Sequence, residues 1–224
     1  MTPTLTRFLM LVAFIALPLV GVLLLGWDWR EIVLLYWLEN VSLGIAMFIK
    51  LLRSAKAPGG DDPSVVKGLS INGQPVYGPG AGVKLAGFFV MHYGGFTFVH
   101  GIFVLLLVGG VMLPPGLAPE SAFLWWGALL VWIIGGTVQV LAARLGPMPQ
   151  LRGTMLMFSA YPRIIVLHVG IILGIILIVE LQWGPAAAVL LIALHAVVDV
   201  VGWMISAAIA RHRSRAAQPA EPRP

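Results

Sequence analysis

Long apolar runs constrain this chain more than any other feature of its sequence. Runs of about 20 hydrophobic residues recur along it, separated by short polar connections. The hydrocarbon core of a bilayer is about 30 Å thick, a distance that a helix of about 20 residues crosses. Helices also satisfy their backbone hydrogen bonds within one segment. We therefore predict an all-α, polytopic membrane bundle of six spans, at about residues 6–26, 29–52, 84–112, 121–143, 161–181 and 185–210.

Composition agrees with this class. Hydrophobic residues make up 59% of the chain and charged residues 10%, whereas a soluble domain has about 25% charged residues. The absence of cysteine excludes disulfides, thiolate metal sites and a cysteine nucleophile. The sequence contains no serine-hydrolase elbow and no phosphate-binding P-loop. The formal charge of +5 does not indicate nucleic-acid binding, because the basic residues lie between the apolar runs and in the tail.

The basic residues predict the orientation. When the connections are assigned alternately to two sides, 13 of the 14 Lys and Arg residues fall on one side. Cytoplasmic connections carry such an excess, so both termini are expected in the cytoplasm and the protein in the bacterial inner membrane. Tryptophans at span ends are expected to be interfacial anchors; they are Trp27, Trp29, Trp125, Trp126 and Trp183.

Residues 1–210 are predicted to form one transmembrane domain. Within it, the Gly/Pro-rich connection 57–83 is expected to be a mobile cytoplasmic loop, with turns at residues 58–60 and 78–80. Residues 211–224 are basic and rich in Ala and Pro, and we expect a disordered tail that contacts anionic lipid head groups. Beyond the lipid bilayer the sequence identifies no partner, and it is compatible with a homo-oligomer.

A few titratable residues lie inside the predicted spans. They are costly in hydrocarbon and so mark a candidate functional site. No lysine or arginine lies deep in any predicted span, so the carboxylates there require a proton, a histidine partner or a metal ion. The titratable residues are Glu39, His92, His100, His168, His195 and Asp199.

The helical rise gives approximate depths for these side chains. Measured from the cytoplasmic ends of their spans, His92 lies about 12 Å deep, His100 about 24 Å and His168 about 10 Å. Glu39 and His195 fall near the middle of the membrane. On this estimate every member of the set except His100 shares a layer between the midplane and the cytoplasmic side.

Three interpretations of this layer are open. In the first, His92, His168, His195 and Asp199 bind a transition metal, zinc or iron, and Glu39 serves as catalytic base in an enzyme acting on a lipid-like substrate. In the second, histidines pair across helices as ligands of a b-type haem. In the third, the residues fix helix packing or relay protons or ions in a transporter or membrane-complex subunit, without metal.

Three further residues are expected to support the site. Tyr36 and Asn40 flank Glu39 on roughly one helical face, and they either hydrogen-bond it or bridge neighbouring helices. His100, nearer the outside, is expected to be a supporting or access residue. The glycines of residues 90–101 are expected to let neighbouring helices approach closely.

Several segments carry a resemblance to a known family: YWLEN at residues 36–40, HYG at 92–94, VHG at 99–101, and Arg163-Ile164 leading to His168. They resemble an uncharacterised family of bacterial and archaeal membrane proteins, known only as a domain of unknown function. The resemblance implies a multi-span membrane protein and brings no established activity. Phe96-x-x-x-His100 and His195-x-x-x-Asp199 also resemble two motifs of intramembrane CAAX-processing proteases, whose paired-glutamate motif this sequence lacks.

Overall fold

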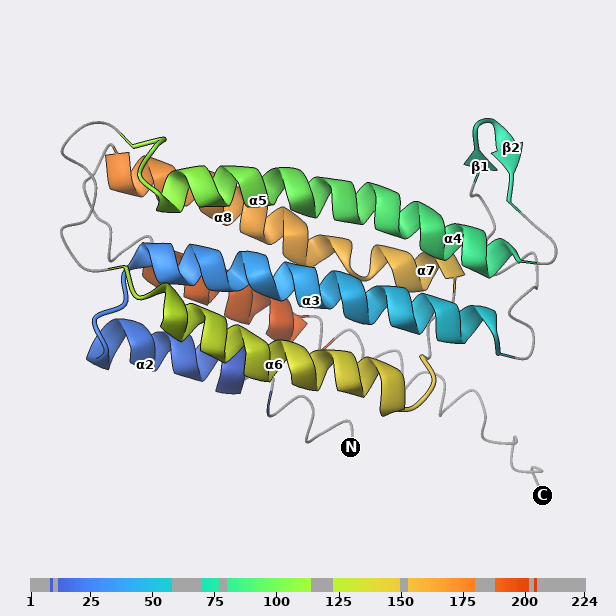
Figure 1. Cartoon of the computed structure of the whole chain (residues 1–224), viewed down its shortest axis with the longest axis horizontal. Helices are drawn as coiled ribbons and strands as arrows, with labels where there is room; N and C mark the ends of the chain where they lie inside the picture. Colours follow the sequence, from blue (N-terminus) through green and yellow to red (C-terminus); the bar gives the residue numbers. More distant parts are fainter. Residues whose placement is uncertain are drawn as a thin grey trace, which may run out of the picture.

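The computed structural model of the chain is an all-α bundle with one short hairpin (Figure 1). It describes residues 9, 12–57, 70–76, 80–113, 123–149, 153–179, 188–201 and 204. The labelled elements are the π-helices η1 (Val12–Ala16) and η3 (Val90–Gly94), the α-helices α2 (Leu17–Leu24), α3 (Trp29–Ala55), α4 (Ala81–Phe89), α5 (Gly95–Val108), α6 (Trp125–Leu145), α7 (Gly153–Phe158) and α8 (Tyr161–Val179), and the strands β1 (Ser70–Ile71) and β2 (Gln74–Pro75). A further helix, Ala188–Val201, is named the His195 helix below. The predicted all-α class is confirmed.

Three of the described helices are long and apolar enough to cross a membrane. They are α3, the continuous helix Ala81–Val108 formed by α4, η3 and α5, and α6. Two shorter apolar helices span Phe14–Leu24 and Ala188–Val201. The chain is therefore a membrane protein with several apolar helices, while the count of six spans and the orientation stay predictions.

Helix α3 is the centre of the bundle. In the most apolar 18-residue stretch of α3, 61% of the residues are buried. The corresponding shares are 33% for Ala81–Val108 and 28% for α6. Figure 1 shows α3 between α4–α5 above and α6 below, and it also contacts α7 and α8. Helices α3 and α6 run in the same direction, and α4–α5 runs the opposite way. Side chains along α3 can therefore meet partners from several helices at once.

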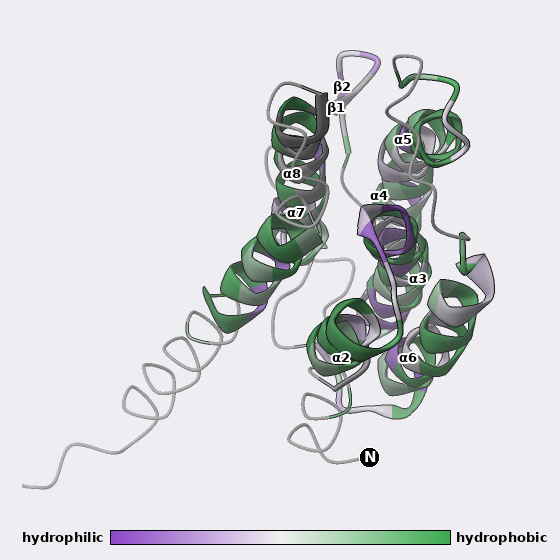
Figure 2. Ribbon diagram, turned by 90° about the vertical axis from the view of Figure 1, so that its left-hand side faces the viewer, coloured by the Kyte–Doolittle hydropathy of each residue, from purple (hydrophilic) through white to green (hydrophobic). Residues whose placement is uncertain are grey.

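The outward faces of the bundle are apolar. Leu24 is 76% exposed, Met91 80% and Phe98 70%. Figure 2 shows hydrophobic residues, in green, along most of the helical surface. Side chains of this kind are poorly solvated by water and well solvated by lipid tails. The surface is therefore that of a bundle surrounded by hydrocarbon.

At one end of the bundle, a buried carboxylate joins the N-termini of α3 and α6. The Asp28 side chain caps α3 by accepting from the N–H of Arg30 at 2.8 Å, and Glu31 accepts from the N–H of Asp28 at 2.9 Å. The second Glu31 oxygen accepts from the N–H of Leu124, the residue just before α6, at 2.6 Å. Glu31 is 0% exposed. Its negative charge lies at the positive ends of two helix dipoles, which stabilises both.

At the other end, a cation joins the same two helices. The Arg53 guanidinium donates to the carbonyls of Ala143 and Gly146, at the C-terminus of α6. Between the two ends, the Ser42 hydroxyl donates to Gln139 Oε1 at 2.8 Å. The positive charge of Arg53 at the negative end of α6 complements the arrangement at Glu31.

Two of the expected interfacial tryptophans lie in the core. Trp27 is 7% exposed and Trp29 is 2% exposed, whereas Trp125 and Trp126 are 38% and 66% exposed. The Trp27 ring packs where glycines of α2 and α6 leave space for it. The anchor prediction is therefore wrong for Trp27 and Trp29, because the short turn between α2 and α3 folds them inward. Trp183 lies outside the described residues.

The connection 57–83 contains the hairpin. Strands β1 and β2 pair antiparallel, with Ser70 opposite Pro75 and Ile71 opposite Gln74. The two turn residues, at positions 72 and 73, have φ angles of 52° and 74°, as a two-residue hairpin loop requires. The turns predicted at 58–60 and 78–79 and the tail 211–224 lie outside the described residues.

Residues 90–101 contain a π-helical turn, η3, between α4 and α5. Gly94 and Gly95 do not mediate close helix approach, because a Cβ at either position would meet no atom within 4 Å. Gly101 does, since the Trp37 indole packs directly against it. The expectation of close approach is therefore correct for Gly101 and wrong for the adjacent pair. Single π-turns inside α-helices are frequent at functional sites.

Candidate functional site

The buried centre of the candidate site is a contact between α3 and the His195 helix. Glu39 Oε2 lies 2.9 Å from His195 Nε2, and Asp199 Oδ2 lies 3.7 Å from the same nitrogen. Glu39 is 1% exposed and His195 is 8% exposed. The Glu39–His195 contact is an ion-pair approach without the alignment of a good hydrogen bond. We name Glu39, His195 and Asp199 the buried triad.

Tyr36 holds the imidazole of the triad in place. Its ring stacks on His195 with centroids 4.2 Å apart and planes 3° from parallel. Its hydroxyl donates to the carbonyl of Phe14 at 3.1 Å. Phe14 belongs to the π-helix η1, and Pro18, four residues further on, has no N–H that could donate to its carbonyl. Tyr36 therefore ties the triad to η1 through a backbone acceptor.

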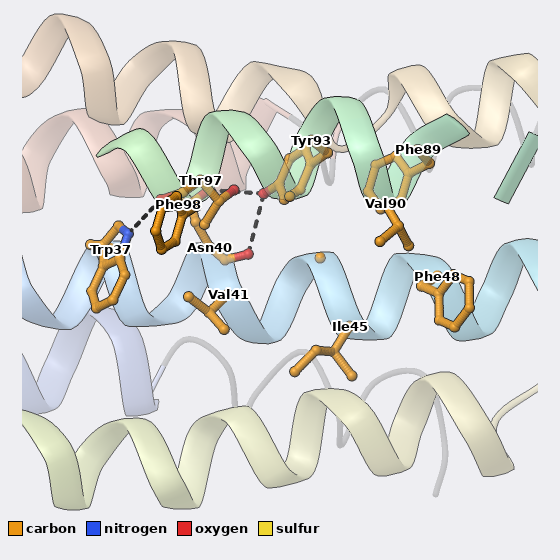
Figure 3. Close-up of a pocket in the computed structure, with 12 residues that line it drawn as sticks. Trp37, Asn40, Val41, Ile45, Phe48, Phe89, Val90, Tyr93, Thr97 and Phe98 are labelled. Carbon is orange, nitrogen blue, oxygen red and sulfur yellow. Dashed lines mark hydrogen bonds between the residues drawn. The ribbon is translucent and has the colours of Figure 1, made fainter. Parts of the chain in front are cut away.

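Asn40 faces away from the triad and joins α3 to η3. Its amide donates to the carbonyl of Tyr36 at 2.8 Å, and its own Oδ1 accepts from the Tyr93 hydroxyl at 3.2 Å (Figure 3). The expected hydrogen bonds from Tyr36 and Asn40 to Glu39 are thus replaced by bonds to other groups. Asn40 bridges neighbouring helices, which was the other interpretation of this residue.

His92 pairs with a tyrosine of α8. Its Nδ1 lies 2.8 Å from the Tyr161 hydroxyl, and its ring stacks on Phe88 with centroids 5.6 Å apart. The His92 side chain is exposed and Tyr161 is half-buried. His92 therefore lies apart from the contacts of the buried triad.

His100 pairs with His168 of α8. His168 Nδ1 lies 2.7 Å from His100 Nε2, with the rings edge to face and Phe96 beside both. His100 is 7% exposed, whereas the His168 side chain is exposed. The direct contact leaves no space for a porphyrin between these two rings, so the pair has no haem-sandwich geometry.

These two pairs correct the grouping by depth. Tyr161 lies level with His92, and His168 lies level with His100, because the spacings of seven and eight residues give nearly equal rises. The depth estimate for His168 assumed that its helix begins at the cytoplasmic edge of the membrane. Helix α7 occupies that level instead, packed against α4. As a result α8 begins about three turns deeper than α4, and His100 rather than His92 meets His168.

The four predicted metal ligands are not brought together. His92 contacts Tyr161, His168 contacts His100, and only His195 and Asp199 share a site. No group of three His, Cys, Asp or Glu residues in the described ranges could hold a metal ion. In the buried triad, both carboxylates approach one imidazole nitrogen and do not surround a common point.

One family model matches nearly the whole chain. The model described as "Family of unknown function (DUF6498)" matches residues 2–222. The chain belongs to the DUF6498 family. This confirms the resemblance to an uncharacterised membrane-protein family, and DUF6498 membership brings no activity with it. No curated protein and no solved structure matches the chain.

Three partners of the DUF6498 site residues were not among the residues predicted from the sequence. They are Phe14, whose carbonyl binds Tyr36, Tyr93, which binds Asn40, and Tyr161, which binds His92. Pro18 was a usable signal for the first, because it removes the N–H that an α-helix would direct at the Phe14 carbonyl. The side chain of Arg163 lies outside the described residues.

Proposed function

We propose that this chain is a membrane protein whose buried triad exchanges protons inside the bilayer, as a proton-coupled transporter or as the proton-handling subunit of a membrane complex. The observation that carries the proposal is the 2.9 Å approach of Glu39 to His195, with Asp199 3.7 Å from the same nitrogen. Tyr36 supports it by stacking on one face of the His195 imidazole.

The Glu39–His195 pair of the triad can hold one proton in two forms, each without net charge on the pair. One is a carboxylate with an imidazolium, and the other is a carboxylic acid with a neutral imidazole. In the proposal the proton is shared by the two side chains of this pair.

Infrared titration of the protein in lipid bilayers tests the proton exchange directly. We expect a carboxylic-acid C=O band that changes with pH in the wild type, because the Glu39 carboxyl gains and loses the proton. The band should be lost in Glu39→Gln and shifted in His195→Gln. His92→Gln is the matched control, since His92 bonds to Tyr161 outside the triad, and it should leave the band unchanged.

A second measurement connects the titration to function. Proteoliposomes with an internal pH dye should show proton flux for wild type and His92→Gln, and little flux for Glu39→Gln. A wild-type spectrum without a pH-dependent carboxyl band, or one that Glu39→Gln leaves intact, would contradict the proposal. A stoichiometric transition metal that copurifies with wild type and is lost in His195→Gln would replace the proton relay with the metal-dependent interpretation.

We further propose six spans with both termini in the cytoplasm of a bacterial inner membrane, and a basic tail that contacts anionic lipid head groups. The charge of the two bundle ends supports this orientation. The end formed by the C-termini of α3 and α6 carries Arg53, Lys56 and Arg144, and the opposite end carries Asp28 and Glu31. Under the proposal, the hairpin lies on the cytoplasmic side.

The orientation can be tested by cysteine labelling, because the wild-type chain contains no cysteine. Gln74→Cys places one thiol on the exposed hairpin, and Val111→Cys places one in the turn after α5, where the side chain is 73% exposed. In intact bacterial cells, a membrane-impermeant maleimide should label Val111→Cys and leave Gln74→Cys unlabelled until the cells are lysed. The reverse pattern would invert the topology, and labelling of both in intact cells would contradict the proposed spans.

A further inference from the structure

A lateral groove of about 610 Å³ lies between α3 and the segment formed by the end of α4, η3 and the start of α5 (Figure 3). Its wall on α3 extends from Trp37 to Phe48. Its wall on the opposite helix extends from Phe89 to Phe98. None of the lining residues is charged, and five are aromatic. The groove therefore fits an apolar ligand without a charged group.

The groove opens to the membrane and runs along the bundle axis. Ile45 and Val90, each 47% exposed, and Phe98, 70% exposed, line it and also belong to the outward surface. Phe48 lies 11 positions after Trp37, which corresponds to about 16 Å of helix. One leaflet contributes about 15 Å to the hydrocarbon core. The length and direction of the groove therefore match those of a lipid chain.

One polar group in the wall lacks a partner. The hydroxyl of Thr97, a residue 7% exposed, has no hydrogen bond within the described part of the chain. The neighbouring polar groups are occupied, since Tyr93 donates to Asn40 and Trp37 donates to the Thr97 carbonyl at 3.0 Å. The hydroxyl is buried in the structure, but threonine in a helix populates two χ1 rotamers, and we expect the second to turn it toward the groove. A buried hydroxyl without a partner is costly, and an oxygen atom of a ligand would satisfy it.

We propose that the groove binds one uncharged long-chain lipid, with its chain along α3 and a head-group alcohol or carbonyl oxygen bonded to Thr97. A phospholipid is excluded as the preferred occupant, because the groove offers its charged head group no ionic partner. The proposal does not depend on proton exchange. Glu39 and Asn40 are consecutive on α3 and point about 100° apart, so the triad and the groove lie on different faces of the helix.

Two adjacent glycines supply a matched pair of variants. Gly94 lines the groove and Gly95 does not, and a Cβ at either position would meet no atom within 4 Å. In nanodiscs, a photoactivatable long-chain alcohol should crosslink to peptides of α3 and η3–α5 in the wild type. Gly94→Leu should reduce this crosslinking by roughly tenfold, because the new side chain fills the groove. Gly95→Leu should leave it unchanged, and thermal unfolding of both variants verifies that they fold.

The head-group contact has its own test. Thr97→Val keeps the shape and removes the hydroxyl, so it should weaken labelling by the alcohol probe by roughly fivefold, the effect of one ordinary hydrogen bond. Labelling by a matched hydrocarbon probe without the alcohol should be unaffected. Equal labelling of Gly94→Leu, Gly95→Leu and wild type would overturn the proposal. Labelling of the groove by a photoactivatable phosphatidylcholine as strong as that by the alcohol would overturn the uncharged head group.

Discussion

Replacing Glu31 with alanine is expected to lower the free energy of unfolding by about 2–4 kcal/mol, because two backbone N–H groups lose their acceptor. These are the N–H of Asp28 at the start of α3 and the N–H of Leu124 at the start of α6. Glu31 accepts hydrogen bonds from them at 2.9 and 2.6 Å, respectively. The carboxylate is 0% exposed, so water cannot replace it without repacking. The measurement is SDS-induced unfolding in detergent micelles, followed by tryptophan fluorescence.

Glu31→Gln separates the hydrogen bonds from the general effect of mutation. An amide side chain has one oxygen where the carboxylate has two, so it can accept only one of the two hydrogen bonds well. It also loses the charge that favours the helix N-termini. The expected order of stability is wild type, then Glu31→Gln, then Glu31→Ala. Equal stability of wild type and Glu31→Ala would show that Glu31 does not join the two helices.

The fold class followed from the sequence because the bilayer restricts the choice of structure. An apolar run long enough to cross the membrane has no water to bond its backbone N–H and C=O groups, and a helix satisfies all of them within the run. Hydropathy did not reveal which residues face inward. Leu24 and Phe14 are equally plausible members of an apolar run, yet one is 76% exposed and the other 0%. Lipid and protein interior are both apolar, so the pattern that orients a soluble helix is weak here.

The candidate site was predicted in part, for a related reason. Glu39, His195 and Asp199 were selected because ionisable residues are rare and costly at membrane depth, and the structure brings these three together. The partner of His168 was missed. Depth along one helix follows from its rise, but the relative depth of two helices depends on where each begins. That level was set by α7, a six-residue helix that no apolar run signals.

The contact between α5 and α3 depends on the absence of a side chain at Gly101. A methyl group added at Gly101 would lie 2.7 Å from Trp37 Cε2 and 3.0 Å from Nε1, inside ordinary contact distance. The indole cannot move freely, because Nε1 donates to the Thr97 carbonyl at 3.0 Å. We expect Gly101→Ala to destabilise the protein by about 2–3 kcal/mol, in the upper range for overpacking. SDS-induced unfolding measures it.

Gly95→Ala is the matched comparison for Gly101→Ala. It makes the same change on the same helix at a position with open space, and alanine is the better helix former by about 1 kcal/mol. It should therefore be neutral or stabilising. Combining Gly101→Ala with Trp37→Phe should recover part of the loss, because the smaller ring vacates the space that the methyl group needs. If Gly101→Ala is as stable as Gly95→Ala, α5 and α3 do not meet through Trp37. Recovery in the double variant would show instead that the closeness of these two helices, and hence the depth of the groove beside them, is set by one glycine and one indole.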